Sequence, residues 1–137
     1  MREILYRGVC TETGDWVKGH YVRLFDDKGN RYHRIYPGYA ESDCGDLYPD
    51  WYEIDLETVG QFTGLTDKNE KKAFEGDIFA TKCNKGVIAF DDDYGTFGFQ
   101  IWWNGFPDDF ATFKDFGKPE FEIIGNIHDN PELLEKK

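Results

Sequence analysis

The sequence has none of the features that would place it in a membrane or in a disulfide-stabilised fold. No apolar run approaches the ~18 residues of a membrane-spanning helix, and the start has no charged-then-apolar signal pattern. The three cysteines, Cys10, Cys44 and Cys83, are odd in number, widely spaced and without a C-x-x-C pair, which argues against a disulfide framework and a zinc knuckle. These absences predict a soluble, cytoplasmic chain with reduced thiols and no membrane partner.

Motifs for catalysis and for nucleotide binding are missing as well. The only serine, Ser42, is not in a G-x-S-x-G pattern, which excludes a serine hydrolase of that type. Gly60, Gly64 and Gly76 are too far apart, and lack the following Lys-Ser or Lys-Thr, to form a phosphate-binding loop. The histidines and cysteines stand at no spacing that a metal site uses. The sequence therefore predicts no catalytic residue, no metal ligand and no cofactor.

Aromatic residues and glycine are abundant, whereas methionine occurs once. The 18% of aromatic residues and the 15 glycines favour a β-rich, turn-rich fold over a helical bundle. A chain of 137 residues is long enough for one domain with a normal hydrophobic core. We predict a single, mostly β domain that divides into two β subdomains. These are a meander over residues 1–60 and a barrel-like part over residues 61–137 that ends in a tail.

The N-terminal part alternates apolar and polar residues with a period of two, which is typical of a half-buried strand. Glycine and aspartate mark turns at residues 13–15 and 26–30, and the alternation places Tyr32, Arg34 and Tyr36 on one face. These runs predict an antiparallel meander. Residues 37–50 hold two prolines, two glycines and four acids without periodicity, which predicts a long surface loop. The predicted strands of this part are residues 4–9, 16–25, 31–36 and 51–54.

In the C-terminal part, short apolar runs separated by polar clusters predict consecutive antiparallel strands that form a small curled sheet or an SH3-like barrel. Polar clusters at residues 82–85 and 91–95 mark its turns, and a further short helical turn at residues 108–113 (DDFATF) is left open as an alternative. Asn130 as N-cap and Pro131 at the first helical position predict one short C-terminal helical turn. The predicted strands of this part are residues 77–81, 86–90, 97–103 and 121–126.

Residues 59–80, VGQFTGLTDKNEKKAFEGDIFA, contain the clearest strand, turn and strand pattern and are predicted to be the hinge of the fold. Glycine allows positive φ, and Asp and Asn side chains bond to the nearby backbone, so these residue types shape turns. The predicted turns are residues 63–64 and 67–69, and residues 74–78 lead tightly into the next strand. The residues assigned to this structural hinge are Gly64, Asp67, Asn69, Gly76 and Asp77.

The hinge segment is one of several stretches that together resemble the YopX family of phage and prophage proteins. The others are DLETVGQ at residues 55–61, IGNIHDNPELL at 124–134, and YRG at 6–8 followed by GDWVKGHYV at 14–22. The resemblance therefore covers most of the chain. It implies an all-β fold, no metal, and a location in the cytoplasm of a bacterial host, and it implies no particular activity.

The formal net charge of −11 is unevenly distributed. Residues 1–39 contain seven Lys and Arg against five Asp and Glu, whereas residues 40–137 contain nine against 22. Such an acidic surface repels phosphate backbones, which argues against double-stranded nucleic acid as a partner, and it attracts basic proteins. The alternative interpretation is a surface that only keeps the chain in solution.

Two features are candidates for an interaction surface. A run of three aspartates, residues 91–93, is the densest charge cluster, but neighbouring carboxylates diverge in a turn and lack the spacing of a calcium loop. The aromatic run 97–103 offers rings for stacking single-stranded bases, yet it contains no basic residue, so a core strand or a protein-binding edge is favoured. The residues assigned to the candidate interaction surface are Asp91, Asp92, Asp93, Trp102 and Trp103.

Three functions remain open from the sequence. The first is a non-enzymatic phage or prophage accessory protein that binds a basic host or phage protein, or that assembles with further copies of itself. The second is a small metal-dependent enzyme, in which the acids of residues 41–50 and 91–93 gather around a divalent ion. The third is a β-barrel that binds single-stranded nucleic acid. The first is favoured because the sequence contains no catalytic constellation.

Overall fold

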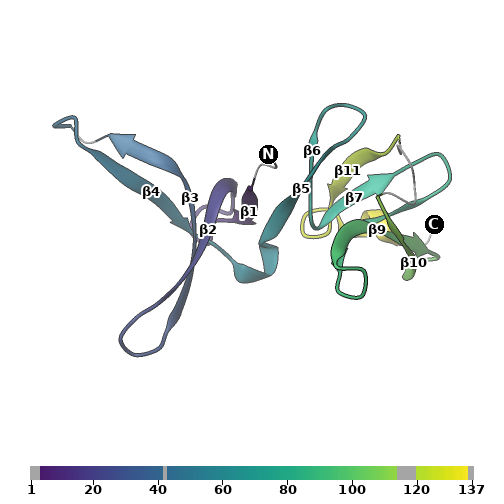
Figure 1. The fold of residues 1–137 in the computed structure, drawn as a ribbon, viewed down its shortest axis with the longest axis horizontal. Helices are drawn as coiled ribbons and strands as arrows, with labels where there is room; N and C mark the ends of the chain where they lie inside the picture. The colour runs from purple at the N-terminus through teal and green to yellow at the C-terminus, as the bar shows by residue number, and fades with distance from the viewer. Residues whose placement is uncertain (1–3, 42, 114–119, 136–137) are drawn as a thin grey trace. The chain divides into compact units, whose positions relative to one another are not determined.

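The computed structural model describes residues 4–41, 43–113 and 120–135 and divides the chain into two units, Met1–Phe62 and Thr63–Lys137. Nearly all of the regular structure is antiparallel β-strand (Figure 1). The described helices are two short 3-10 turns, η1 (Leu56–Thr58) and η2 (Pro131–Leu134). The predicted mostly β fold is confirmed. Neither described helix is long and apolar enough to cross a membrane.

The first unit is an antiparallel meander. Its strands are β1 (Tyr6–Val9), β2 (Trp16–Phe25), β3 (Arg31–Glu41), β4 (Leu47–Glu53) and β5 (Gly60–Thr66), and β5 continues past Phe62 into the second unit. Neighbouring strands pair in the order β4-β3-β2-β1-β5. The predicted turns are confirmed: Gly14 has a φ of 76°, and the Asp26 carboxylate accepts the backbone N–H groups of Lys28 and Asn30.

Residues 37–50 lie mostly in strands, and the prediction of a long surface loop is wrong. The two prolines suggested a loop because proline lacks the N–H group that the interior of a sheet needs. In the structure, Pro37 falls at a register shift of the β3–β4 pair, between Ile35 and Gly38, and Pro49 lies on β4, at the edge of the sheet. Both are positions at which sheets tolerate proline.

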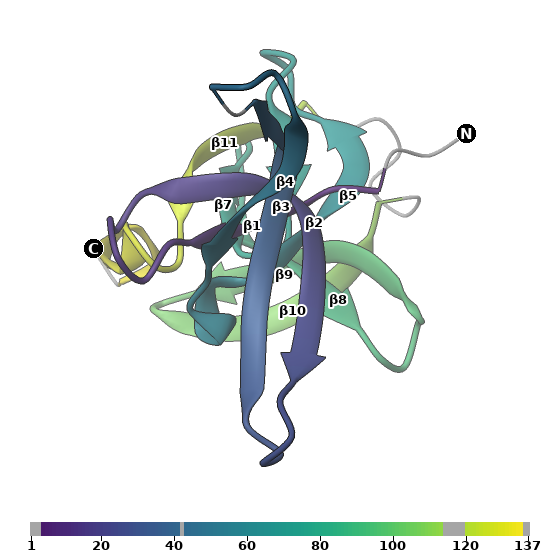
Figure 2. The same cartoon turned by 90° about the vertical axis from the view of Figure 1, so that its left-hand side faces the viewer.

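The second unit is built on an open five-stranded sheet with the strand order β10-β9-β8-β7-β11. Its strands are β6 (Lys72–Phe74), which lies beside β5, then β7 (Asp77–Ala80), β8 (Lys85–Asp91), β9 (Thr96–Trp103), β10 (Phe106–Thr112) and β11 (Glu122–Asn126). Figure 2 shows the curvature of β8, β9 and β10. Since β10 and β11 are separate edges, the described residues form a curled sheet and no closed barrel.

Both faces of this sheet carry hydrophobic side chains. Successive residues of a strand point to opposite faces. Phe79 and Phe99 therefore pack edge to face on one side, with ring centres 4.6 Å apart. On the other side Ile78 packs with Leu134 of η2, and Trp102 lies against this second cluster. The C-terminal turn is thus part of the hydrophobic core of the unit.

Two segments after Phe62 that the sequence associates with turns lie in strands. Residues 108–113, for which a short helical turn was left open, lie mostly in β10, because the chain turns earlier at Asn104 and Gly105, which have φ values of 54° and 83°. An Asn-Gly pair is typical of tight hairpins, so the signal was present in the sequence. Gly64, predicted to lie in a turn, is inside β5, although its φ of 92° is positive as expected.

The predicted C-terminal helical turn is confirmed as η2, a 3-10 helix with Pro131 in its first turn. Asn130 occupies the N-cap position as predicted, but its side chain makes no capping bond to this helix. Its Oδ1 instead accepts the backbone N–H of Asn126 at 3.3 Å. Asn130 therefore stabilises the turn before the helix.

Candidate functional site

Asp67, a predicted hinge residue, connects distant backbone segments of the second unit. Its side chain is 6% exposed, and its carboxylate accepts the N–H groups of Asn69, Lys71 and Ile123 at 2.8–2.9 Å. Burial raises the pKa of Asp67, but these three hydrogen bonds and the charge of Lys71 outweigh burial, so the pKa lies below its usual value. The carboxylate is occupied with structural bonds and is not available for chemistry.

Gly76 and Asp77 are also structural. Gly76 has a φ of 92°, its N–H donates to the carbonyl oxygen of Ile88 at 2.8 Å, and its own carbonyl accepts from the N–H of Ile127 at 2.9 Å. Asp77 is 1% exposed, and its Oδ2 accepts the N–H of Phe74 at 2.8 Å. These two residues therefore hold the turn between β6 and β7 against β8 and the segment after β11.

The residues assigned to the interaction surface lie at the two ends of one hairpin. Asp91 and Lys85 are the ends of β8, and Trp102 of β9 pairs with Lys85. With a rise of ~3.3 Å per residue, the aspartate cluster and the tryptophans are roughly 20 Å apart. Asp91 also bonds within its own turn, because its Oδ1 accepts the N–H groups of Asp93 and Tyr94 at 2.8 and 3.1 Å. The structure does not bring the two groups together.

An aromatic pair stands at the tip of the β9–β10 hairpin. Trp103 and Phe106 are directly opposite each other in the strand pairing, so both side chains leave the same face of the sheet. They are 68% and 72% exposed, more than any other large hydrophobic side chain described in the second unit. The sequence pointed to Trp103 but not to Phe106, whose position depends on the Asn-Gly turn that sequence reasoning overlooked.

A small apolar pocket of ≈ 320 Å³ adjoins this tip. Trp102 faces away from Trp103 and lines the pocket. Its indole Nε1–H is buried and has no hydrogen-bond acceptor among the described residues, and such a group costs about 1–3 kcal/mol. An acceptor brought by a bound molecule would remove this cost. The lining residues are Trp102, Gly105, Ile127, Pro131, Leu134 and Glu135.

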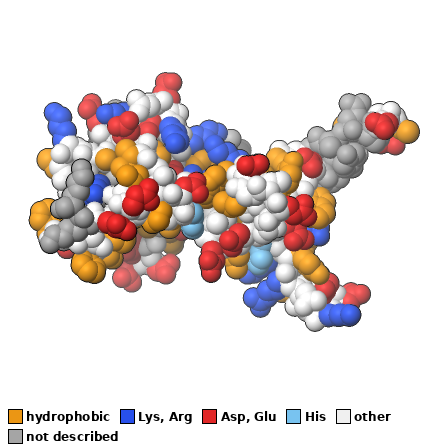
Figure 3. Space-filling view, turned by 180° about the vertical axis from the view of Figure 1, so that it is seen from behind, with side chains coloured by type: hydrophobic (Ala, Val, Ile, Leu, Met, Phe, Trp, Pro, Cys, Tyr) orange, Lys and Arg blue, Asp and Glu red, His pale blue; other side chains and the backbone are white. Residues whose placement is uncertain are grey.

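The edge strand β10 has three features that disfavour pairing with another strand. Pro107 has no N–H group, the register shifts between Pro107 and Phe110, and Asp108 and Asp109 are exposed. The edge of β10 is therefore poorly suited to pair with a further strand. Figure 3 shows hydrophobic and acidic side chains interspersed on the surface of the second unit.

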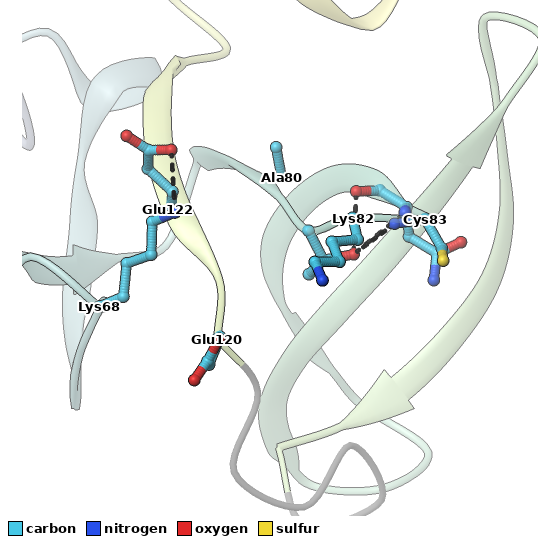
Figure 4. A pocket seen from close by; sticks show the side chains of 8 residues that line it. Lys68, Ala80, Lys82, Cys83, Glu120 and Glu122 are labelled. Atoms are coloured by element: carbon cyan, nitrogen blue, oxygen red, sulfur yellow. Dashed lines mark hydrogen bonds and ion pairs between the residues drawn. The ribbon is translucent and has the colours of Figure 1, made fainter.

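A larger pocket of the second unit, ≈ 630 Å³, has walls of both charges (Figure 4). Lys68 extends to Glu122, with 3.7 Å between Nζ and Oε2, while Lys82 and Cys83 come from the turn after β7. Glu120 lies on the strand side of the pocket below Glu122. Because its lining contains two lysines and two glutamates, this pocket favours neither an anionic nor a cationic ligand.

The described ranges contain no candidate metal-binding site. No group of three or more His, Cys, Asp and Glu side chains is arranged there to hold an ion. The two acidic segments of the predicted enzyme, residues 41–50 and 91–93, belong to different units. The β9–β10 tip is therefore the better-defined candidate site.

Comparison with known proteins gives a family and similarity to solved structures. A family model described as YopX protein matches residues 5–135. Among solved structures, the chain is similar to the crystal structure of protein EF1440 from Enterococcus faecalis, with 26% sequence identity and a TM-score of 0.55. That match covers 98% of this chain and 100% of the other. No curated protein matches.

Proposed function

Because this chain belongs to the YopX family, we propose that it is a phage or prophage accessory protein that binds another protein and catalyses no reaction. The observation that carries the proposal is the exposed Trp103–Phe106 pair at the β9–β10 tip. Aromatic side chains supply large contact areas and are enriched where binding energy concentrates. Two such exposed side chains on one face of a hairpin tip are typical of a protein-binding anchor.

The charges around the tip indicate the chemistry of the partner. Asp108 and Asp109 are exposed on β10 next to the aromatic pair, and the chain as a whole is acidic. A partner with an apolar depression bordered by Lys or Arg would complement both features. The expected partner is thus a basic host or phage protein.

A capture experiment tests the proposal. The immobilised full chain is incubated with bacterial host lysate beside the double variant Trp103→Ser/Phe106→Ser and the control Tyr94→Ser. Tyr94 is a matched control because it is an exposed aromatic residue in the turn at the far end of β9. Losing two anchor side chains should weaken binding at least about 30-fold, so we expect a protein retained by wild type and control but not by the double variant.

Equal retention by all three proteins would place the binding site elsewhere. Retention of a second copy of the chain, with a concentration-dependent change in elution volume, would replace the basic partner by self-assembly.

Charge reversal near the tip should slow association with the captured protein. We expect Asp108→Lys/Asp109→Lys to lower the on-rate about tenfold at low salt and much less at physiological salt, where the Debye length is about 8 Å. Asp92→Lys/Asp93→Lys is the matched control and should have a smaller effect, because that cluster is roughly 20 Å from the tryptophans. Stopped-flow or surface-based kinetics measure both. A salt-independent on-rate would mean that Asp108 and Asp109 only keep the surface solvated and do not attract the partner.

A further inference from the structure

One face of the first unit combines aromatic rings with cations. In the strand pairing Val22 is opposite Arg34, Arg34 is opposite Glu53, and His20 is opposite Tyr36, so these side chains share a face. Alternation along each strand adds further residues to it. This arginine–aromatic face comprises Lys18, His20, Tyr32, Arg34, Tyr36 and Trp51.

Arg34 is the centre of this face. Its guanidinium carbon lies 3.8 Å from the centre of the Trp51 ring and 5.8 Å from that of Tyr32. Its Nε is buried without a hydrogen-bond partner, and among the described residues no carboxylate forms an ion pair with Arg34. Trp51 is 41% exposed, and Lys18 and His20 are exposed as well. The face therefore presents a cation between accessible rings, with Glu53 directly opposite it in the strand pairing.

This combination matches single-stranded nucleic acid. Unpaired bases stack on aromatic rings and on arginine planes, while Lys and Arg contact the phosphates. An acidic peptide would use the cations but not the rings. A duplex keeps its bases stacked inside, and the net charge of −11 opposes it at long range. The aromatic strand β9, by contrast, contains no basic residue between Phe97 and Trp103.

We propose that the arginine–aromatic face binds single-stranded nucleic acid, with bases stacked on Trp51 and Tyr36 and phosphates contacted by Arg34 and Lys18. Glu53 lies on the same face, and the chain is acidic overall, so the binding is weak and requires low salt. The site is independent of the β9–β10 tip, because it uses residues of β2, β3 and β4 alone.

The proposal is tested by fluorescence anisotropy at about 50 mM salt. The probe is a labelled oligothymidylate of about 12 nucleotides, a length within the site sizes of proteins that bind single strands. We expect binding by wild type and about tenfold weaker binding by Trp51→Ala, which loses one stacked base. Arg34→Ala should also weaken binding and reduce the slope of log affinity against log salt by about one. Arg34→Lys, which keeps the charge but not the plane, should fall between Arg34→Ala and wild type.

The opposite face of the same strands provides matched controls. Phe25 pairs with Arg31, whose guanidinium carbon lies 5.6 Å from the centre of the Phe25 ring. Phe25→Ala and Arg31→Ala should bind as wild type does, and so should Trp103→Ser/Phe106→Ser. Circular dichroism melts exclude loss of fold. Absence of wild-type binding, equal losses in the Phe25 and Arg31 variants, or equal affinity for the corresponding duplex would each overturn the proposal.

Discussion

Asp67→Ala should lower the free energy of unfolding by about 3–5 kcal/mol, because it removes one carboxylate that accepts three backbone N–H groups, of which that of Ile123 is buried and the other two are partly buried. Two of these groups belong to the turn at residues 67–71, and the third belongs to Ile123 of β11. The substitution therefore loosens the turn and also the attachment of an edge strand. Denaturant unfolding followed by circular dichroism measures the loss.

The pH dependence of the free energy of unfolding distinguishes the contribution of the Asp67 charge from that of the side chain's shape. Since the folded-state pKa of Asp67 lies below its usual value, the ionised carboxylate stabilises the fold above the unfolded pKa of about 3.9. This stabilisation is lost as the pH falls through the lower folded-state pKa. Asp67→Asn, which keeps the shape, should be less destabilised than Asp67→Ala and should show a shallower loss of stability below about pH 4. Parallel pH curves for wild type and Asp67→Asn would contradict this role.

Gly76→Val and Asp77→Ala should each lower the free energy of unfolding by about 1–3 kcal/mol. At Gly76 there is room for a side chain, since the nearest atom to an added Cβ is 3.8 Å away, so the cost comes from the φ of 92°. The backbone cannot easily relax, because both its N–H and its carbonyl are bonded. Asp77→Ala instead leaves the buried N–H of Phe74 without its acceptor.

Gly38→Val is the matched control for the glycine substitution. Gly38 lies in strand β3, an added Cβ there has no atom within 4 Å, and Gly38 is not among the glycines with positive φ. We expect a thermal midpoint close to that of wild type for Gly38→Val. Unchanged midpoints for both Gly76→Val and Asp77→Ala would mean that the predicted hinge does not hold the second unit together.

Strands β8 and β9 of the second unit were predictable because their boundaries carry strong local signals, whereas β6 and β10 were not predicted. The Asp-rich turn at residues 91–95 separates two alternating runs, and the observed β8 and β9 differ from the prediction by one residue at each changed end. The pairing of residues 37–50 was not predictable from periodicity. The two prolines masked it, and their compatibility with the sheet depends on an edge position and a register shift.

The candidate sites were predictable only in part for the same reason. Trp102 and Trp103 stood out in the sequence, but Phe106 joins Trp103 only through the register of a hairpin whose Asn-Gly turn was overlooked. The contact of Arg34 with Trp51 requires the pairing of β3 with β4, which the sequence did not predict because residues 37–50 between the two predicted strands were assigned to a loop. Both sites depend on cross-strand neighbours, and these are set by register and not by local composition.

Amide hydrogen exchange of the full chain, alone and with the captured partner protein, tests the central claim most directly. We expect the partner to slow exchange at residues 102–110, which form the β9–β10 tip, and to leave exchange in the turn at residues 91–95 unchanged. Protection confined to residues 91–95, or no change anywhere in β9 and β10 despite binding, would contradict the placement of the protein-binding site at Trp103 and Phe106.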